Sequence, residues 1–267
     1  MKPEAWDWYA KNDPLYGVCA DMSKRGNKWD INEFFNTGEI EAQRVLDYLN
    51  SMGMAANQTR EMLDFGCGVG RLTRAFAKRF HHCYGVDISP GMVEKANELN
   101  RGIDNITFGL MDIHDLDGLK ADKFSFIYSS LVLQHIEPSL QDKYLKSLVR
   151  LLKPNGTFIF QLADSYRPPQ NISIYDRVAE FRKRLQPRAR ISSILKPLGL
   201  HLSQSEPGAD MFGMGESMVT ESINHSGGKI MDIRLTNSTD TNFNGDLRFL
   251  ESEPVTGWVS KQYTVTK

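Results

Sequence analysis

The sequence predicts an α/β fold in which helices cover both faces of a parallel sheet. Between residues 39 and 163, short apolar runs alternate with stretches of helical periodicity. This order is typical of a parallel sheet, because parallel neighbours need a crossover connection that is usually a helix. The chain has 267 residues, of which 40% are hydrophobic, so it is long enough for one large domain or for one domain with a sizeable insertion.

The first half of this alternation predicts three helices and three strands. Apolar residues at helical spacing follow Gly38 and predict the first helix. Basic residues in the last turn support the second helix, and Pro90 in the first turn supports the third. In chain order the predicted elements are a helix at 39–52, a strand at 62–65, a helix at 71–80, a strand at 81–87, a helix from Pro90 to about 100 and a strand at 106–111.

The second half predicts the rest of the sheet. A fourth strand, rich in aromatic and β-branched residues, is predicted at 123–130. Pro154-Asn155-Gly156 is expected to stop the amphipathic helix that follows. The remaining predicted elements are that helix at 139–153, a strand at 157–163, a helix at 215–228 that ends in a glycine cap, and alternating strands at 229–235 and 257–267.

The regular pattern breaks between residues 164 and 213. This segment contains five prolines and two helical stretches near 174–186 and 189–198, which indicates an insertion. From Tyr166 to His201 it carries eight basic and two acidic residues, although the whole chain has a net charge of −1. The basic residues suit a lid that recognises an anionic acceptor, a solvated helical face, or docking on anionic lipid headgroups. The predicted division of the chain is an N-terminal lead-in or cap at 1–38, a core at 39–163, the insertion at 164–213, and a last helix with two closing strands at 214–267.

Charge and composition exclude several classes of function. A net charge of −1 gives no overall attraction to nucleic acid or to an anionic membrane. No apolar run approaches the length of a membrane span, and residues 1–10 lack the apolar core of a signal peptide, so stable membrane insertion is not expected. The three cysteines, Cys19, Cys67 and Cys83, fit neither a disulfide framework nor a zinc site. We therefore expect a cytoplasmic protein without a metal.

Three glycines mark the end of the first predicted strand, in LDFGCGVGR over residues 63–71. Glycine lets the chain turn with positive φ and lets a ligand approach the backbone, and a following helix directs its free N–H groups to the same place. The segment is expected to bind an anionic or strongly polar group, unless it is only a tight turn. The third glycine comes one residue earlier than in the dinucleotide fingerprint. Asp87 ends the next strand, where it suits either the two hydroxyls of a ribose or the start of a helix.

Four motifs in order resemble those of class I S-adenosylmethionine-dependent methyltransferases. They are LDFGCGVGRLTRAFA followed by YGVDISPGMVEKA, then FSFIYSSLVLQHIE, LVRLLKPNGTFIF and GWVSKQYTVTK. The N-terminal DPLYGV and FFNTGEIEAQRVL resemble the lead-in of a bacterial branch that acts on small molecules. The resemblance implies a Rossmann-like, doubly wound, seven-stranded sheet whose last strand runs antiparallel between the fifth and sixth. It also implies S-adenosyl-L-methionine as the cofactor and a small molecule as the methyl acceptor.

The same resemblance assigns roles in cofactor binding. Asp64 would hold the loop and help to bind the ammonium group, and Arg71 would reach the carboxylate unless it is a solvated helix residue. Asp87 would bind the ribose. The other expected contacts are Gly66, Cys67 and Gly68 beside the methionine part, Ile88 and Met92 on the adenine, Asp112 with Ile113 at the adenine amino group, and the Ser129 carbonyl at the ammonium; Asp112 also suits a solvated turn.

His135 is the candidate general base. It follows the fourth strand, at the rim where the methyl group is expected to emerge. Its ordinary pKa of about 6.5 suits proton transfer near neutral pH, and a hydroxyl acceptor needs such a base. The alternative is a histidine that only packs against the loop. The N-terminal aromatic residues Trp6, Trp8, Tyr9 and Tyr16 are expected either to close over the cofactor or to cap the core.

Three other functions remain open at this point. An RNA or protein methyltransferase would use the same cofactor domain, but the sequence lacks a separate RNA-binding module and an Asn/Asp-Pro-Pro-Tyr motif after the fourth strand. An NAD-dependent oxidoreductase is disfavoured by the glycine spacing. A cofactor-binding protein without catalysis is the third.

Overall fold

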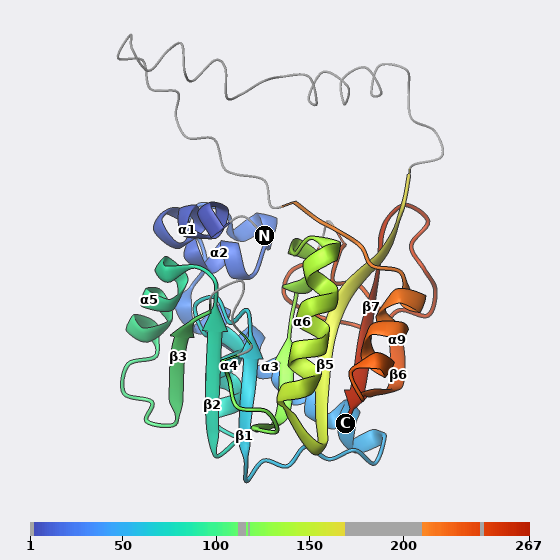
Figure 1. Ribbon diagram of the computed structural model, residues 1–267. Coiled ribbons are helices and arrows are strands. Elements are labelled where there is room, and N and C mark those ends of the chain that lie inside the picture. The colour runs from blue at the N-terminus through green and yellow to red at the C-terminus, as the bar shows by residue number, and fades with distance from the viewer. Residues whose placement is uncertain (1–2, 112–115, 117, 169–209, 241–242) are drawn as a thin grey trace, which may run out of the picture.

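The computed structural model describes residues 3–111, 116, 118–168, 210–240 and 243–267 (Figure 1). The predicted basic lid and its two helical stretches lie almost entirely outside these residues, as do Asp112 and Ile113. Seven described strands form one sheet in the order β3-β2-β1-β4-β5-β7-β6. They are β1 (Glu61–Phe65), β2 (His82–Asp87), β3 (Ile106–Leu110), β4 (Phe124–Ser129), β5 (Leu152–Arg167), β6 (Lys229–Thr236) and β7 (Gly257–Thr266).

The strand directions confirm the predicted doubly wound sheet. β1 runs parallel to β2 and β4, and the same direction continues to β3 and β5. β7 lies between β5 and β6 and is antiparallel to both. The strand order reverses at β1 and β4, and ligands of such sheets bind outside the carboxyl ends of the strands at this point.

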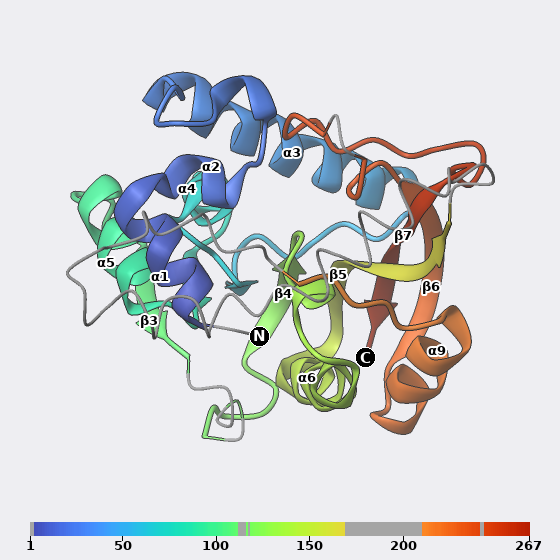
Figure 2. The ribbon, with the colours of Figure 1, turned by 90° about the horizontal axis from the view of Figure 1, so that it is seen from above.

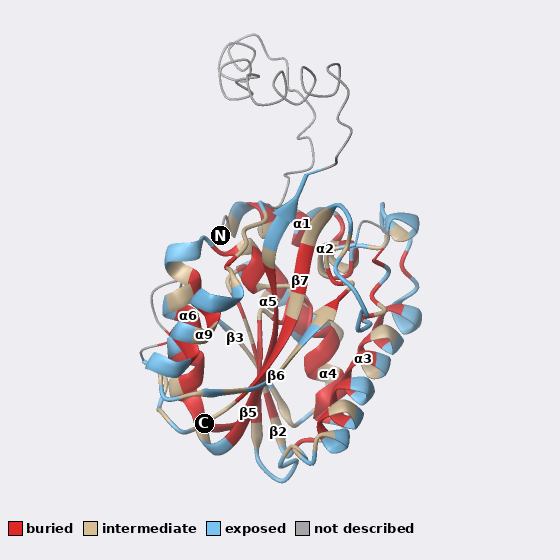
Figure 3. Cartoon of the chain, turned by 90° about the vertical axis from the view of Figure 1, so that its right-hand side faces the viewer, coloured by how far each residue is buried: buried red, intermediate tan, exposed pale blue. Residues whose placement is uncertain are grey.

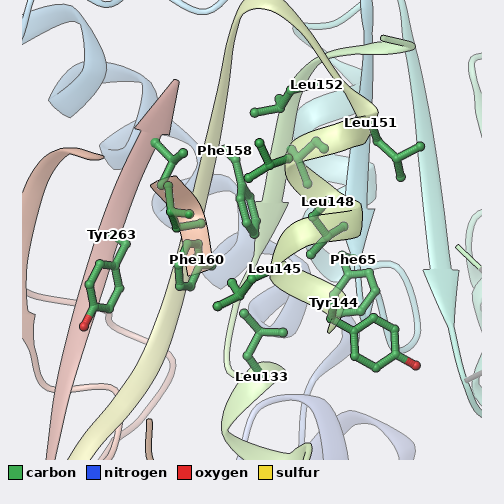
Figure 4. Close-up of a cluster of buried hydrophobic side chains, with 14 of the residues drawn as sticks. Phe65, Leu133, Tyr144, Leu145, Leu148, Leu151, Leu152, Phe158, Phe160 and Tyr263 are labelled. Carbon is green, nitrogen blue, oxygen red and sulfur yellow. The ribbon is translucent and has the colours of Figure 1, made fainter. Parts of the chain in front are cut away.

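Helices cover both faces of the sheet, as the alternation predicted (Figure 2). On one face, α6 and α9 pack on a cluster that includes Phe65, Leu145, Phe158 and Tyr263 (Figure 4). On the other face, α3 and α4 bury Leu46, Phe76 and their neighbours against β1 and β4. The strands are mostly buried, whereas the helices are exposed on their outer sides (Figure 3). The helices are α3 (Ile31–Ser51), α4 (Arg71–Ala77), α5 (Pro90–Leu99), α6 (Pro138–Leu151) and α9 (Glu216–His225).

The first predicted helix begins earlier than expected. α3 starts at Ile31, where the Asp30 carboxylate accepts hydrogen bonds from the N–H groups of Asn32 and Glu33. Gly38 lies inside the helix rather than before it. A Cβ atom at this glycine would lie 2.6 Å from the backbone oxygen of Arg71, so the close approach of α4 requires glycine here.

The turn predicted at Pro154-Asn155-Gly156 belongs to a strand. α6 ends at Leu151, but β5 starts directly afterwards and runs through these three residues to Arg167. Asn155 has a φ of 62°, and its N–H donates to the backbone oxygen of Lys267. The predicted helix breaker is therefore the lead-in of a long strand that is held by the end of β7.

The N-terminal residues form a cap on the carboxyl edge of the sheet. α1 (Pro3–Asn12), α2 (Pro14–Val18) and the short helix η1 (Met22–Lys24) precede α3. Tyr9, Tyr16 and Trp29 pack in a third buried cluster that also contains Val69 and Met92. This N-terminal cap, residues 3–30, therefore covers the loop after β1 and the start of α5 (Figure 1).

Candidate functional site

The glycine loop, residues 66–70, is the tightest part of the site. Gly66 and Gly68 have φ values of 78° and 53°, which side chains rarely adopt. A Cβ atom at Gly66 would lie 2.2 Å from Cγ2 of Val132, and one at Gly68 would lie 2.4 Å from Cγ2 of Val18. Both backbone angle and space therefore require glycine at these two positions.

Four N–H groups of the loop donate within the protein and are not free to bind an anion. The N–H groups of Gly66 and Cys67 both donate to the backbone oxygen of Val86, and that of Gly70 donates to the oxygen of Cys67. The N–H of Gly68 donates to the Asp87 carboxylate at 2.8 Å. A pyrophosphate would need these donors. The geometry thus disfavours a dinucleotide and suits a ligand that only passes close to the backbone.

Asp87 is buried at the end of β2, with a carboxylate that keeps free capacity. One oxygen accepts from the N–H of Gly68 and the other from the N–H of Ser89 at 2.9 Å. A carboxylate has about four acceptor positions, so it can still accept two hydroxyls. Burial raises the pKa of Asp87, and the backbone hydrogen bonds oppose this rise. Ser89, not Asp87, caps α5, because its hydroxyl accepts from the N–H of Met92.

Asp64 lies one residue before the end of β1 and holds the next helix. Its Oδ2 atom accepts a 2.6 Å hydrogen bond from the hydroxyl of Thr73 on α4. Burial raises the pKa of Asp64 to about 7, although the bond from Thr73 lowers it. An ammonium group placed beside this carboxylate would favour its ionised form.

Arg71 is buried at the first position of α4 and is not a solvated helix residue. Its Nη2 atom donates to Oε2 of Glu41 at 2.7 Å, and its Nη1 atom donates to the hydroxyl of Thr37 at 3.3 Å. Its Nε atom is buried without a hydrogen-bond partner among the described residues. A buried guanidinium N–H without an acceptor is costly, so this donor suits a ligand oxygen such as a carboxylate.

A cavity of about 430 Å³ brings most of the predicted residues together. Asp64, Arg71, Asp87 and His135 all line it, with the glycines of the loop. Ser129 is buried and does not line it, whereas the next residue, Ser130, does. From the N-terminal cap, Trp6, Tyr9 and Tyr16 line the cavity but Trp8 does not. The predicted residues on the wall are Asp64, Gly66, Cys67, Gly68, Arg71, Asp87, Ile88, Met92 and His135.

The wall fits an adenosyl sulfonium with an amino-acid tail. Asp87 has acceptor capacity for a ribose, and Ile88, Met92 and Met111 supply apolar surface for a base. At the other end, the unpartnered Nε of Arg71 and the carboxylate of Asp64 suit a carboxylate and an ammonium group. The volume lies within the range of roughly 300–1,000 Å³ that is usual for small-molecule sites.

His135 lies on the wall with its imidazole held from two sides. Its Nδ1 atom is 2.8 Å from the backbone oxygen of Asp210, and its ring meets that of Trp6 edge-on at 5.2 Å between centroids. A carbonyl only accepts, so Nδ1 carries the hydrogen and Nε2 keeps a lone pair. The side-chain nitrogen of Gln134 lies 3.5 Å from Nε2, at the limit of hydrogen-bond distance. Burial lowers the pKa of His135, and the Asp210 carbonyl opposes this change.

Several residues of the site carried no sequence signal. Glu41 lies on α3 within FFNTGEIEAQRVL, where the sequence analysis assigned it no role, and it accepts from Arg71, from Tyr128 at 2.8 Å and from Ser130 at 2.8 Å. The opposite wall comes from the segment after β6, with Ser238, Thr239, Asp240 and Phe243. Glu41 sits at a buried position of a periodic helix, and a charge at a core position is the only feature that marks it.

Two features are absent from the described residues. No helix there is long and apolar enough to span a membrane. No group of three or more His, Cys, Asp or Glu side chains in the described part of the chain is arranged to hold a metal ion.

Comparison with known proteins agrees with this geometry. Residues 63–160 match the family model of the methyltransferase domain. The chain is 29% identical over 114 residues to the 2-heptyl-1-hydroxyquinolin-4(1H)-one methyltransferase of Mycobacteroides abscessus, which is 42% of this chain and 50% of that protein. It is 25% identical over 185 residues to the ubiquinone biosynthesis O-methyltransferase of Methylococcus capsulatus, which is 66% of this chain and 76% of that protein. The chain thus spans only half the length of the first of these relatives.

Solved structures share the fold. The structure of magnesium protoporphyrin IX methyltransferase from Synechocystis with bound S-adenosylmethionine superposes with a TM-score of 0.55 at 15% identity, and the match covers 100% of this chain and 98% of that one. The domain match, the strand order and the wall of the cavity agree with one another and exclude the oxidoreductase alternative. The chain therefore carries a class I S-adenosylmethionine-dependent methyltransferase domain.

Proposed function

We propose that the protein transfers the methyl group of S-adenosylmethionine to a hydroxyl of a small molecule, with His135 as the general base. The observation that carries this proposal is the 2.8 Å contact between Nδ1 of His135 and the backbone oxygen of Asp210. Because Nδ1 donates to the Asp210 carbonyl, Nε2 is an acceptor on the wall of the cavity. A hydroxyl needs such an acceptor for its proton, whereas a thiolate does not.

The cofactor site follows from the residues already described. When bound, S-adenosylmethionine supplies an electrophilic methyl group. Asp87 holds the ribose, Arg71 and Asp64 hold the amino-acid tail, and the glycine loop passes beside them. The N-terminal cap would exclude water from the bound cofactor. Positioning of this kind can contribute roughly 7–11 kcal/mol in favourable cases.

The lining of the cavity and two relatives support this class of acceptor. Trp6, Met22, Met211 and Phe243 give this part of the cavity an apolar character, and Ser238 and Thr239 add hydroxyl groups. One named relative methylates a hydroxyquinolinone and another is an O-methyltransferase of ubiquinone biosynthesis. An aromatic hydroxyl is thus the preferred acceptor. The basic residues of the insertion at 164–213 would add recognition of an anionic group.

Turnover of labelled S-adenosylmethionine tests the proposal. Quinolinols and catechols are compared as methyl acceptors with the matching aromatic amines, and the amount of labelled product is measured for each. Methylation of the hydroxyls is expected. Transfer to the amines alone would contradict the proposal.

The His135→Asn variant tests the role of the base. It should lose about 10²–10⁴-fold in turnover, because general-base assistance is lost, and keep its affinity for the cofactor. Since burial lowers the pKa of His135, its neutral form persists at neutral pH, and kcat should fall only as the pH drops below about 6.5. His82→Asn is the matched control, because His82 bonds to Thr107 at the amino end of β2, away from the site. Unchanged turnover in His135→Asn would remove it from the mechanism.

A further inference from the structure

A second cavity lies between α3, β7 and the segment after β6. Its volume is about 420 Å³, and it shares no lining residue with the cofactor cavity. Figure 2 shows the orange-red segment running alongside α3. Contacts between Arg44 and Asp246 and between the rings of Tyr48 and Phe249 confirm that the two lie together. The lining residues are Glu41, Arg44, Val45, Asp47, Tyr48, Leu247, Arg248, Phe249 and Gln262.

The side-chain amide of Gln262 is the unusual feature of this cavity. Gln262 is 2% exposed, and its Nε2 atom has no hydrogen-bond partner in the part of the chain that the structure describes. Among the described residues that line the cavity, this is the only buried side-chain nitrogen or oxygen left without one. A buried amide N–H without an acceptor costs free energy, so the site is incomplete as it stands.

A chain of hydrogen bonds fixes which end of the amide is free. The single hydroxyl hydrogen of Tyr128 goes to the Glu41 carboxylate at 2.8 Å, so its oxygen must accept from the side-chain nitrogen of Gln161 at 3.2 Å. That nitrogen also donates to Oε1 of Gln262 at 3.0 Å. Because the Glu41 carboxylate can only accept, it fixes the direction of each hydrogen bond in the series. The free end of Gln262 is therefore the donor, and it requires an acceptor atom.

The charged groups of the cavity already have hydrogen-bond or ion-pair partners. Arg44 and Arg248 both pair with Asp246, and the carboxylate oxygens of Glu41 accept from Arg71, Tyr128 and Ser130. The Asp47 carboxylate accepts from Gln43 at 2.8 Å. A charged ligand would have to displace these partners. A neutral ligand would not, and it would find apolar walls in Val45, Leu247, Tyr48 and Phe249.

We propose that this cavity is a second ligand site, which takes a small, neutral, flat molecule whose carbonyl oxygen accepts from Nε2 of Gln262. Phe249 lines the site with 45% of its surface exposed. A flat apolar ligand would cover it. The site is distinct from the cofactor cavity, because the two share no lining residue, although Glu41 on its wall also pairs with Arg71.

The test uses 4-fluoroacetophenone and fluorine NMR on the full chain. The probe is an aryl ketone with one acceptor and no donor. Its matched control is 4-fluoro-α-methylstyrene, in which a methylene group replaces the carbonyl oxygen. The ketone should bind saturably and about tenfold more tightly than the hydrocarbon, the value of one hydrogen bond. Saturating S-adenosylhomocysteine should leave the binding unchanged.

Two variants locate the site. Leu247→Trp fills the cavity and should abolish binding, whereas Leu250→Trp should retain it, because Leu250 is exposed on the same segment but does not line the cavity. Gln262→Leu should bind the ketone and the hydrocarbon equally. If Gln262→Leu fails to fold, the two tryptophan variants and the comparison of the two probes still test the proposal. Absence of binding, equal affinity for the two probes, or displacement by S-adenosylhomocysteine would overturn the proposal.

Discussion

Glu41 joins three polar groups around the site. Its two oxygens accept from Arg71, Tyr128 and Ser130, and its side chain is only 2% exposed. It therefore orients the guanidinium that lines the cofactor cavity. This makes Glu41 a positioning residue for Arg71.

Replacement of Glu41 tests this role against a neighbour on the same helix. Glu41→Ala should lower the free energy of unfolding by about 3–5 kcal/mol, because it leaves the Arg71 charge buried without a partner. Glu39→Ala should cost less than about 1 kcal/mol, because the pairs of Glu39 with Lys78 and Arg79 are partly exposed. Urea unfolding measures both. Equal losses in the two variants would contradict the assignment.

Asp64 should make stability depend on pH. Its pKa in the folded protein is about 7 and its ordinary value is 3.8, so between these values the folded protein holds a proton that the unfolded chain has released. Its contribution to stability therefore declines as the pH rises from about 4 to 7. In Asp64→Asn, stability should no longer decline over this pH range. Asp47→Asn, on the surface of α3, should show the same decline as the wild type. Unfolding curves at several pH values measure the difference, and parallel profiles for wild type and Asp64→Asn would contradict it.

At the scale of single elements, the glycine loop links three parts of the fold. It follows β1, and it packs against Val132 from the segment after β4 and against Val18 from α2. The backbone angle and the lack of space at Gly66 are separate requirements. Only the lack of space can be relieved by a substitution elsewhere, at Val132.

Gly66→Ala should weaken cofactor binding and stability more than Gly53→Ala. Both glycines have a positive φ, which costs an alanine about 1–2 kcal/mol, but only at Gly66 does the new Cβ also meet another side chain. Adding Val132→Ala to Gly66→Ala should recover the part of stability that is due to overlap. Thermal unfolding and calorimetry with S-adenosylmethionine measure these changes. The same loss at Gly53 would show that overlap plays no part.

At the scale of the whole molecule, the site is assembled from the carboxyl edge of the sheet, the N-terminal cap and the segment after β6. Residues from Trp6 to Phe243 meet in one cavity. Cofactor binding should therefore stabilise the entire domain rather than one element.

Thermal unfolding with added ligand tests this expectation. S-adenosylmethionine at 100 times its Kd should add about 2.7 kcal/mol, which corresponds to a rise in Tm of roughly 5–10 °C for a chain of this size. NAD at the same concentration should cause no shift in Tm, because four N–H groups of the glycine loop already donate within the protein. A rise with NAD and none with S-adenosylmethionine would contradict the cofactor assignment.

The sequence by itself determined the order of elements and the edge of the sheet at which the candidate site lies. Periodicity and turn residues are local properties, so β1, β2, α5 and β4 lie within one or two residues of their predicted ranges. The motifs placed Asp64, Arg71, Asp87 and His135 at the ends of parallel strands, and such ends meet in space.

Only the tertiary structure decided how those residues are used. The internal hydrogen bonds of the glycine loop, the pairing of Arg71 with Glu41 and the contact of His135 with Asp210 join residues 19 to 75 positions apart. The glycine at position 38 and the extension of β5 likewise depend on Arg71 and on β7. Contacts between distant residues leave no periodic trace in the chain, because each partner alone is compatible with many environments.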